Sequence, residues 1–221
     1  MSRFRSPRWW PLGVLLAYLA LAAAGNILIF GGVVVARVMG RAPTVEGDDL
    51  PRIENFRQVD GKVYAGAQPD DEAFRGLADL GVELVVDLRA HRRGDPGRTD
   101  PALLKSLGMD YVRLPVPDGQ APGDDTVARF IETVQGAEGK VFVHCGGGVG
   151  RSTVMSAAYL ASMGQNPSVL DQLGVGPPTF EQIWYVAAVG KDDPTARSRP
   201  VELFSRYIVD GPRQLFHRLT G

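Results

Sequence analysis

Residues 144–152 read His-Cys-Gly-Gly-Gly-Val-Gly-Arg-Ser and directly follow the apolar run Val141-Phe142-Val143. Cys145 stands six residues before Arg151, and nearly all the residues between them are glycine. Because glycine tolerates positive φ, the amide groups of such a loop can point inward without side-chain clashes. Helix-forming residues continue from Ser152 to Leu160. The pattern predicts a strand, an anion-binding loop and a helix, in that order.

A cysteine inside such a loop is suited to nucleophilic catalysis. The thiolate is the reactive form, and an ordinary thiol with a pKa of about 8.5 is mostly protonated at neutral pH. The loop amides, the positive end of the helix and the Arg151 guanidinium can all stabilise a thiolate at Cys145. The same donors can bind a phosphate dianion, with Arg151 as a bidentate partner. We therefore predict a phosphate site on the amides of Gly146, Gly147, Gly148, Val149, Gly150 and Arg151.

The segment resembles the signature of the cysteine-dependent tyrosine and dual-specificity phosphatases, His-Cys-x5-Arg followed by Ser or Thr. Every element of that signature is present, at His144, Cys145, Arg151 and Ser152. Two flanking segments look like small atypical dual-specificity phosphatases, namely Asn55-Phe56-Arg57-x-Val59-x-Gly61-x-Val63-Tyr64 through Gly66-x-Gln68-Pro69, and Val86-Asp87-Leu88-Arg89. The resemblance implies a phosphatase core over roughly residues 56–190, a phosphocysteine intermediate, and no metal or other cofactor.

The family also implies a general acid, because an alkoxide or phenoxide leaves poorly without a proton. Relatives carry an aspartate on a mobile loop some thirty residues before the cysteine. Asp118, in the loop 114–122, stands at that place. Asp124 and Asp125 are the alternatives, although their position before a helix suits N-capping and helix-dipole roles. A structural role for Asp118, closing a turn beside Gly119, is the competing interpretation.

Three further side chains have expected roles near the cysteine. By the resemblance, the Ser152 hydroxyl assists the departure of sulfur when water hydrolyses the phosphocysteine. His144 orients the loop by hydrogen bonding and helps to keep the cysteine ionised, or is merely a buried histidine. Gln182 either helps to place the hydrolytic water or belongs to helix packing.

Strand and helix patterns alternate along the rest of the chain. A hairpin is predicted to turn at Asp60-Gly61, because alternating apolar residues flank that dipeptide. Helical spacing indicates helices over 71–80, 101–107 and 127–137, and apolar runs indicate strands over 82–88, 111–114 and 141–143. This order predicts an α/β domain whose central, mostly parallel sheet is flanked by helices, as in the phosphotyrosine phosphatases it resembles.

Composition sets further limits. The chain has 221 residues, a mass of 23.8 kDa and a formal net charge of −1, which gives no reason to expect nucleic-acid binding. Its single cysteine excludes an internal disulfide. We divide the chain into a basic segment 1–11, a membrane helix 12–36, a linker 37–55, a catalytic domain 56–190 and a partly helical tail 191–221. The tail is expected either to pack on the domain or to rest on a membrane surface.

Residues 12–36 are almost wholly apolar, with Asn26 as the strongly polar exception. About 20 such residues cross a bilayer as a helix, so we predict a single-pass membrane anchor. A cleaved signal peptide is the alternative, because Ala22-Ala23-Ala24 resembles a processing site. Arginines lie close to both ends of the run, so the positive-inside rule favours neither orientation.

The expected substrate is a phosphate monoester: phosphotyrosine, and by extension phosphoserine or phosphothreonine, in proteins, or a small phosphomonoester. The loop interior carries no lysine or second arginine, which disfavours a polyanionic lipid. A phospholipid or phosphoinositide is the alternative substrate, because a membrane anchor would bring the enzyme close to lipids. Basic residues that could contact a lipid headgroup are His91, Arg92, Arg93 and Arg98. A rhodanese-type sulfurtransferase has a shorter loop, and a non-catalytic phospho-binding module lacks one of the catalytic residues. Neither of these two classes fits the sequence as well as a phosphatase does.

Overall fold

The computed structural model describes residues 10–41, 45, 50–90, 99–189 and 197–220. Its strands are β1 (Arg57–Gln58), β2 (Val63–Gly66), β3 (Val82–Arg89), β4 (Asp110–Val116) and β5 (Lys140–His144). Its α-helices are α1 (Trp10–Val38), α2 (Asp71–Asp79), α3 (Pro101–Ser106), α4 (Asp124–Gly136), α5 (Arg151–Ser162), α6 (Val169–Val175), α7 (Phe180–Val189), α8 (Arg199–Phe204) and α9 (Gly211–Thr220). A π-helical segment, η1 (Ser205–Val209), joins α8 to α9.

The strands form one sheet in the order β1-β2-β5-β3-β4. β2, β5, β3 and β4 run parallel, and β1 pairs antiparallel with β2 through the predicted hairpin. The predicted mostly parallel α/β sheet is therefore confirmed. β5 lies at the centre of the sheet, so the loop that follows it opens at the carboxyl ends of the parallel strands, where open α/β sheets bind their ligands.

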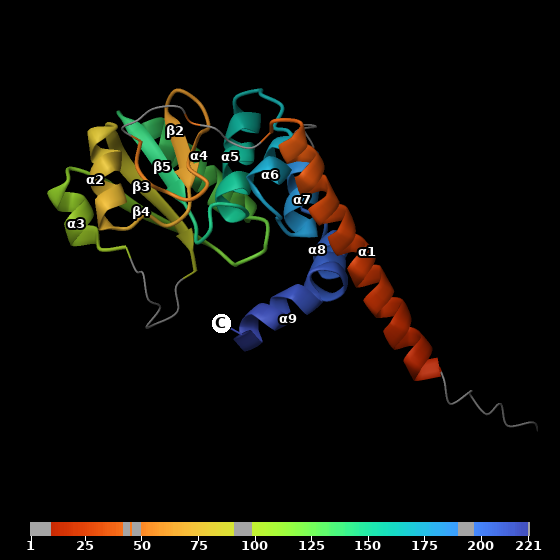
Figure 1. Cartoon of the computed structure of the whole chain (residues 1–221). Coiled ribbons are helices and arrows are strands. Elements are labelled where there is room, and N and C mark those ends of the chain that lie inside the picture. The colour runs from red at the N-terminus through yellow and green to blue at the C-terminus, as the bar shows by residue number, and fades with distance from the viewer. Residues whose placement is uncertain (1–9, 42–44, 46–49, 91–98, 190–196, 221) are drawn as a thin grey trace, which may run out of the picture.

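Helices cover both faces of this sheet (Figure 1). Val85 and Phe142 point toward α2 and α3, where Leu77 and Leu104 are fully buried. The residues that alternate with them, Val86 and Val143 among others, point toward Phe130 of α4 and Met155 of α5. This alternation is the period-2 pattern of a strand buried on both faces, and it explains why the sequence of β3 is a continuous apolar run.

The starts of two helices follow from their capping residues. Asp70 accepts a hydrogen bond from the Ala73 amide at 2.8 Å and caps α2. α4 begins at Asp124, three residues before the predicted start, and its N-cap is Gly123. The N-capping role offered for Asp124 and Asp125 is therefore wrong, because both lie inside the first turn, where they face the positive end of the helix dipole.

The packed domain begins before the predicted boundary at residue 56. Ile53 is buried in the core cluster around Phe142, and the Ala67 amide donates to the Glu54 carbonyl at 2.9 Å. The tail also belongs to the packed structure. Ser205, Val209 and Asp210 are buried, which agrees with the prediction that the tail packs on the domain.

α1 packs along one side of the molecule (Figure 1). Val33 and Ala36 contact Leu173 of α6, and Asn26 donates to the Val209 carbonyl at 2.7 Å. α1 also carries large apolar residues that are exposed, among them Leu15, Leu19 and Leu28. Of the described helices, α1 is the one long and apolar enough to cross a bilayer, by length and composition alone; a signal sequence or a buried core helix can share those properties.

Candidate active site

The Gly-rich loop joins β5 to α5, as the sequence predicts, and its shape depends on Gly148. This residue has φ of +71°, and a Cβ there would lie 2.6 Å from the Ala67 nitrogen and 2.7 Å from the Gly66 carbonyl carbon. Both atoms are backbone of β2 and the turn after it, which cannot move aside. The close approach of two backbones therefore requires glycine at this position.

Cys145 lies at the base of the loop and is only 3% exposed. Its Sγ is 3.6 Å from the Ser152 Oγ, within reach of a thiol hydrogen bond to that hydroxyl. Ser152 in turn donates to the Gly148 carbonyl at 3.0 Å. The serine hydroxyl thus touches both the sulfur and the loop backbone.

A buried arginine that the sequence reasoning did not single out as a site residue supports this loop from behind. Arg57 donates to the Gly148 carbonyl at 2.9 Å and to the Thr153 Oγ1 at 2.9 Å, and its Nη2 lies 3.4 Å from the Ser152 Oγ. Burial lowers the pKa of Arg57 to about 10, and the nearby Cys145 opposes that shift. In the sequence, Arg57 could have been noticed because it belongs to the segment Asn55-Phe56-Arg57, which resembles dual-specificity phosphatases.

Asp118 and Arg151 meet at the mouth of the loop. The Asp118 Oδ1 lies 2.9 Å from the Arg151 Nη2, with the two side chains 87% and 12% exposed respectively. An ion pair with so exposed a partner contributes little to stability. A phosphate that offers two oxygens to the guanidinium can therefore replace this carboxylate.

His144 is fully buried beneath the loop. Its Nδ1 lies 3.3 Å from the Cys145 carbonyl oxygen, its ring stacks on Phe142, and its Nε2 is 4.0 Å from the Asp87 Oδ1. Asp87 is also bound by Arg89 and by the Tyr111 hydroxyl at 3.0 Å. Burial and the Asp87 charge raise the pKa of Tyr111 to about 12. These contacts fix the end of β5 relative to β3 and β4.

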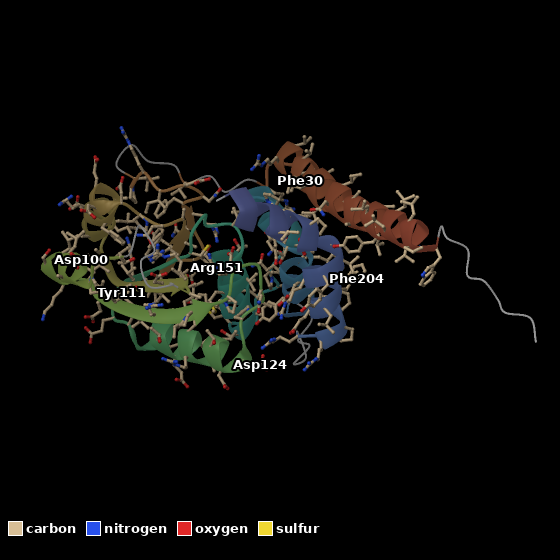
Figure 2. All side chains as sticks on the ribbon, turned by 90° about the horizontal axis from the view of Figure 1, so that it is seen from below. Phe30, Asp100, Tyr111, Asp124, Arg151 and Phe204 are labelled. Carbon is tan, nitrogen blue, oxygen red and sulfur yellow. The ribbon has the colours of Figure 1, made fainter. Side chains whose placement is uncertain are left out.

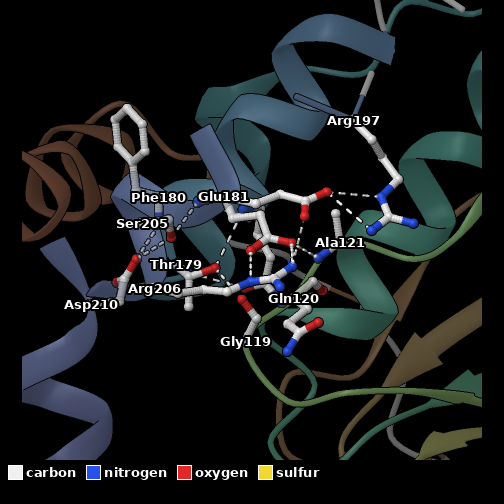
Figure 3. Close-up of polar contacts among 12 residues, drawn as sticks. Gly119, Gln120, Ala121, Thr179, Phe180, Glu181, Arg197, Ser205, Arg206 and Asp210 are labelled. Atoms are coloured by element: carbon white, nitrogen blue, oxygen red, sulfur yellow. Dashed lines mark hydrogen bonds and ion pairs between the residues drawn. The ribbon is translucent and has the colours of Figure 1, made fainter. Parts of the chain in front are cut away.

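The loop that carries Asp118 is fixed by the first turn of α7 and the residue before it (Figure 3). Thr179 Oγ1 donates to the Gly119 carbonyl at 2.7 Å, and the Ala121 amide donates to Glu181 Oε1 at 2.9 Å. Gln182 Nε2 lies 3.3 Å from the Gln120 carbonyl. Gln182 therefore holds the loop and also lines the pocket, so both of its predicted roles remain compatible with its position.

One pocket of about 520 Å³ brings several of the predicted residues together, whereas His144, Gly146, Gly148 and Ser152 are not among its lining residues. Its wall includes Cys145, Arg151, Asp118 and loop glycines. It also includes residues from outside the predicted catalytic domain: Phe30 of α1, and Arg213 and Gln214 of α9. Asp124 and Asp125 are not among the lining residues, and His91, Arg92, Arg93 and Arg98 lie outside the described residues. Seen from below, Arg151 lies between the sheet and the C-terminal helices (Figure 2).

Comparisons with known proteins agree with this geometry. A family model described as DSP-PTPase phosphatase fused to NAD+ kinase matches residues 51–176, more than half of the chain. The tyrosine phosphatase-like protein 197R of Invertebrate iridescent virus 6 is 29% identical over 111 residues, which are 47% of this chain and 40% of that protein. The chain thus matches less than half the length of this relative.

Solved structures share the fold. A DUF442 protein from Shewanella putrefaciens CN-32 superposes with a TM-score of 0.54 at 24% identity, over 66% of this chain and 95% of that one. PTPMT1, solved in complex with PI(5)P, superposes with a TM-score of 0.53 at 21% identity, over 62% of this chain and 96% of that one. At these identities the likeness concerns the fold.

Proposed function

The chain belongs to the dual-specificity-like DSP-PTPase phosphatase family, and from this premise we propose that it hydrolyses phosphate monoesters through a phosphocysteine at Cys145. One observation carries the proposal. Cys145, Arg151 and Asp118 line the same pocket, at the end of the central strand, with the Ser152 hydroxyl 3.6 Å from the sulfur. This arrangement supports the roles of nucleophile for Cys145, anion-binding group for Arg151, proton donor for Asp118 and partner of the departing sulfur for Ser152.

In the first step the Cys145 thiolate attacks phosphorus in line with the ester oxygen. The amides of Gly146 to Gly150 and the Arg151 guanidinium bind the equatorial oxygens, where negative charge spreads in the transition state. Asp118 gives a proton to the leaving oxygen as the P–O bond breaks. His144 and Arg57 hold the loop in shape and do not touch the substrate.

In the second step water attacks the phosphocysteine. Asp118, now a carboxylate, accepts the proton from that water, and inorganic phosphate forms as the P–S bond breaks. The electron pair of that bond returns to sulfur. The Ser152 hydroxyl can then turn from the Gly148 carbonyl to the sulfur and stabilise the departing thiolate.

Two substrate classes fit this mechanism, and both are proposed for this chain. One is phosphotyrosine, together with phosphoserine and phosphothreonine, in proteins, or a small phosphomonoester. The other is a phosphorylated membrane lipid, which is favoured by the presence of Phe30 from the apolar helix α1 in the pocket wall. For either class, we propose that α1 keeps the enzyme at a membrane.

Phosphate release from an aryl phosphate by the full chain in detergent micelles tests the mechanism. We expect Cys145→Ser to abolish release and Asp118→Asn to slow it by about 100-fold or more. Asp125→Asn is the matched control, since Asp125 lies in α4 outside the pocket. Activity that persists in Cys145→Ser would show that Cys145 is not the nucleophile.

A further inference from the structure

The pocket around Cys145 is completed by segments that the family match does not include. Arg213 and Gln214 lie beyond residue 176, and Phe30 lies before residue 51. Gln214 also touches the loop of the general acid, because a Cβ added at Gly119 would lie 3.0 Å from the Gln214 Nε2. Substrate preference can therefore depend on residues of this chain that lie outside the shared phosphatase core.

Arg213 lines the same pocket as Arg151 and supplies a second cationic group to it. Its Nη2 donates to the Asp210 Oδ1 at 2.8 Å and to the Pro178 carbonyl at 3.2 Å. Its Nε and Nη1 have no acceptor among the described residues, and the side chain is 22% exposed. One edge of the guanidinium is thus fixed while other N–H groups remain free to bind a ligand.

The Arg213 side chain is held firmly because its partner is held firmly. Asp210 is fully buried, accepts from the Ser205 hydroxyl at 2.6 Å and accepts from the Phe180 amide at 3.0 Å (Figure 3). An arginine preorganised in this way loses little conformational entropy when it binds an anion. The interior of the Gly-rich loop has no second basic residue, so Arg213 takes that place from a different segment.

The wall of the pocket includes an apolar side chain from α1, and the helices that complete the pocket carry further exposed apolar residues. Phe30 is 47% exposed on α1 and lines the pocket together with Arg213. Tyr207 of η1 and Leu215 of α9 are 67% and 58% exposed, and α1 adds a long exposed apolar side. Phe30 lies beside the C-terminal helices (Figure 2). A charged pocket with Phe30 in its wall, next to helices that carry further exposed apolar residues, matches an amphiphile whose head is anionic.

We infer that the substrate is a membrane phospholipid that carries a terminal phosphomonoester and a second anionic group close to it. Cys145 and Arg151 take the phosphomonoester, Arg213 binds the second anion, and the acyl chains leave past Phe30 toward α1. This assignment rests on the proposed phosphatase activity and adds the substrate class to it. A phosphopeptide would leave the apolar border of the pocket exposed, so the lipid fits the described surface better.

Three substrates compared on the full chain in mixed detergent–lipid micelles test the assignment. The first is a diacylglycerol phospholipid that carries a phosphodiester and a terminal phosphomonoester. The second is phosphatidic acid, which lacks the second anionic group. The third is the water-soluble deacylated form of the first lipid. We expect kcat/KM to be highest for the first lipid. We expect Arg213→Gln to lower its kcat/KM by about 10- to 100-fold relative to that for phosphatidic acid.

Matched variants separate binding from folding. Arg213→Lys keeps the charge and should restore part of the preference, whereas Arg199→Gln removes an exposed arginine outside the pocket and should leave the preference intact. Phe30→Ala should reduce the preference for the acylated lipid over its deacylated form, with Leu28→Ala as the control on α1. Melting temperatures verify that each variant is folded.

Several outcomes would overturn the lipid assignment. One is an equal loss on both lipids in Arg213→Gln; another is equal use of the acylated and deacylated substrates. A third is a phosphotyrosine peptide that exceeds every lipid in kcat/KM. In all three, phosphate is still released from an aryl phosphate, so the phosphatase proposal stands. If no substrate releases phosphate, the phosphatase proposal itself fails.

Discussion

Ser152 is the residue whose hydroxyl can serve two partners, the Cys145 sulfur and the Gly148 carbonyl. If it stabilises the departing thiolate, Ser152→Ala should slow hydrolysis of the phosphocysteine by about 10- to 100-fold and change its formation less. Rapid-quench kinetics with an aryl phosphate would then show a burst of the aryl alcohol before a slow steady state. Ser156→Ala is the control, because Ser156 is buried on the same helix but bonds the Ser152 carbonyl. A slow steady state without a burst would contradict the assignment.

Gly148 and Gly147 are neighbours in the loop with different constraints. A Cβ at Gly148 would meet the backbone of Gly66 and Ala67, whereas a Cβ at Gly147 has open space. Gly148→Ala should therefore lower the free energy of unfolding by about 2 kcal/mol or more. Gly147→Ala should change it by less than about 0.5 kcal/mol. Chemical denaturation of the full chain in detergent measures both, and equal values would show that the loop adapts to a side chain at Gly148.

At the scale of elements, α7 connects the loop that carries Asp118 to the tail through Glu181. This buried carboxylate accepts from the Ala121 amide and from Arg206 Nε and Nη2, the last two at 2.8 Å. In Glu181→Gln the Arg206 charge loses a partner, so we expect a loss of about 1–3 kcal/mol in unfolding free energy.

The same substitution should also affect catalysis, because the loop of Asp118 loses an anchor. We expect kcat for an aryl phosphate to fall while inhibition by inorganic phosphate changes little. Glu202→Gln is the control, since Glu202 pairs with Arg206 and Arg197 and does not contact the loop. An unchanged kcat in Glu181→Gln would mean that Thr179 and Gln182 hold the loop without it.

α5 is tied to the β1–β2 hairpin by Tyr159, which donates to the Asp60 Oδ2 at 2.9 Å. Burial, followed by the Asp60 contact, raises the pKa of Tyr159 to about 12. In the unfolded chain tyrosine loses its proton near pH 10, so between about pH 10 and 12 the unfolded state binds fewer protons and stability falls as pH rises.

Tyr159→Phe should make this alkaline loss of stability less steep, although Tyr111 and Tyr185 contribute in the same direction. Urea unfolding at pH 9 and pH 11 measures the slope. Tyr207→Phe, at an exposed position, serves as the comparison. An equal slope in both variants would show that Tyr159 ionises alike in the folded and unfolded chain.

The sequence is informative for elements that local patterns specify. The strand, loop and helix around Cys145 and the hairpin at Asp60-Gly61 follow from short-range spacing, and the structure has both. Phe30 and Arg213 could not be predicted as pocket residues, for another reason. Their roles depend on contacts between segments far apart in the chain, and no spacing within one segment reports which side chains share a pocket. The start of α4 was misplaced because its N-cap, Gly123, provides no side-chain signal.

At the scale of the whole molecule, we expect the exposed apolar residues of α1 to hold the chain at a membrane. We expect the full chain to stay in the membrane fraction during an alkaline carbonate wash. Leu15→Asp combined with Leu19→Asp places two charges among the exposed apolar residues of α1, at a cost of about 3 kcal/mol each inside a bilayer. This variant should move to the soluble fraction, whereas Met163→Asp, exposed on the catalytic domain, should not. Retention of the double variant would exclude α1 as the membrane contact.

The contacts of α1 with η1 also have a consequence for biosynthesis. Tyr18 and Asn26 bond the carbonyls of Tyr207 and Val209, across sequence separations of 189 and 183 residues. At a translation rate of roughly 5–20 residues per second, the ribosome needs about 10–40 s to make η1 after α1. Until α6 and then η1 are made, the apolar residues of α1 lack these packing partners and are open to a membrane or a chaperone. The pocket around Cys145 includes residues of α1 and α9, so it is completed only after the last helix of the chain has been made.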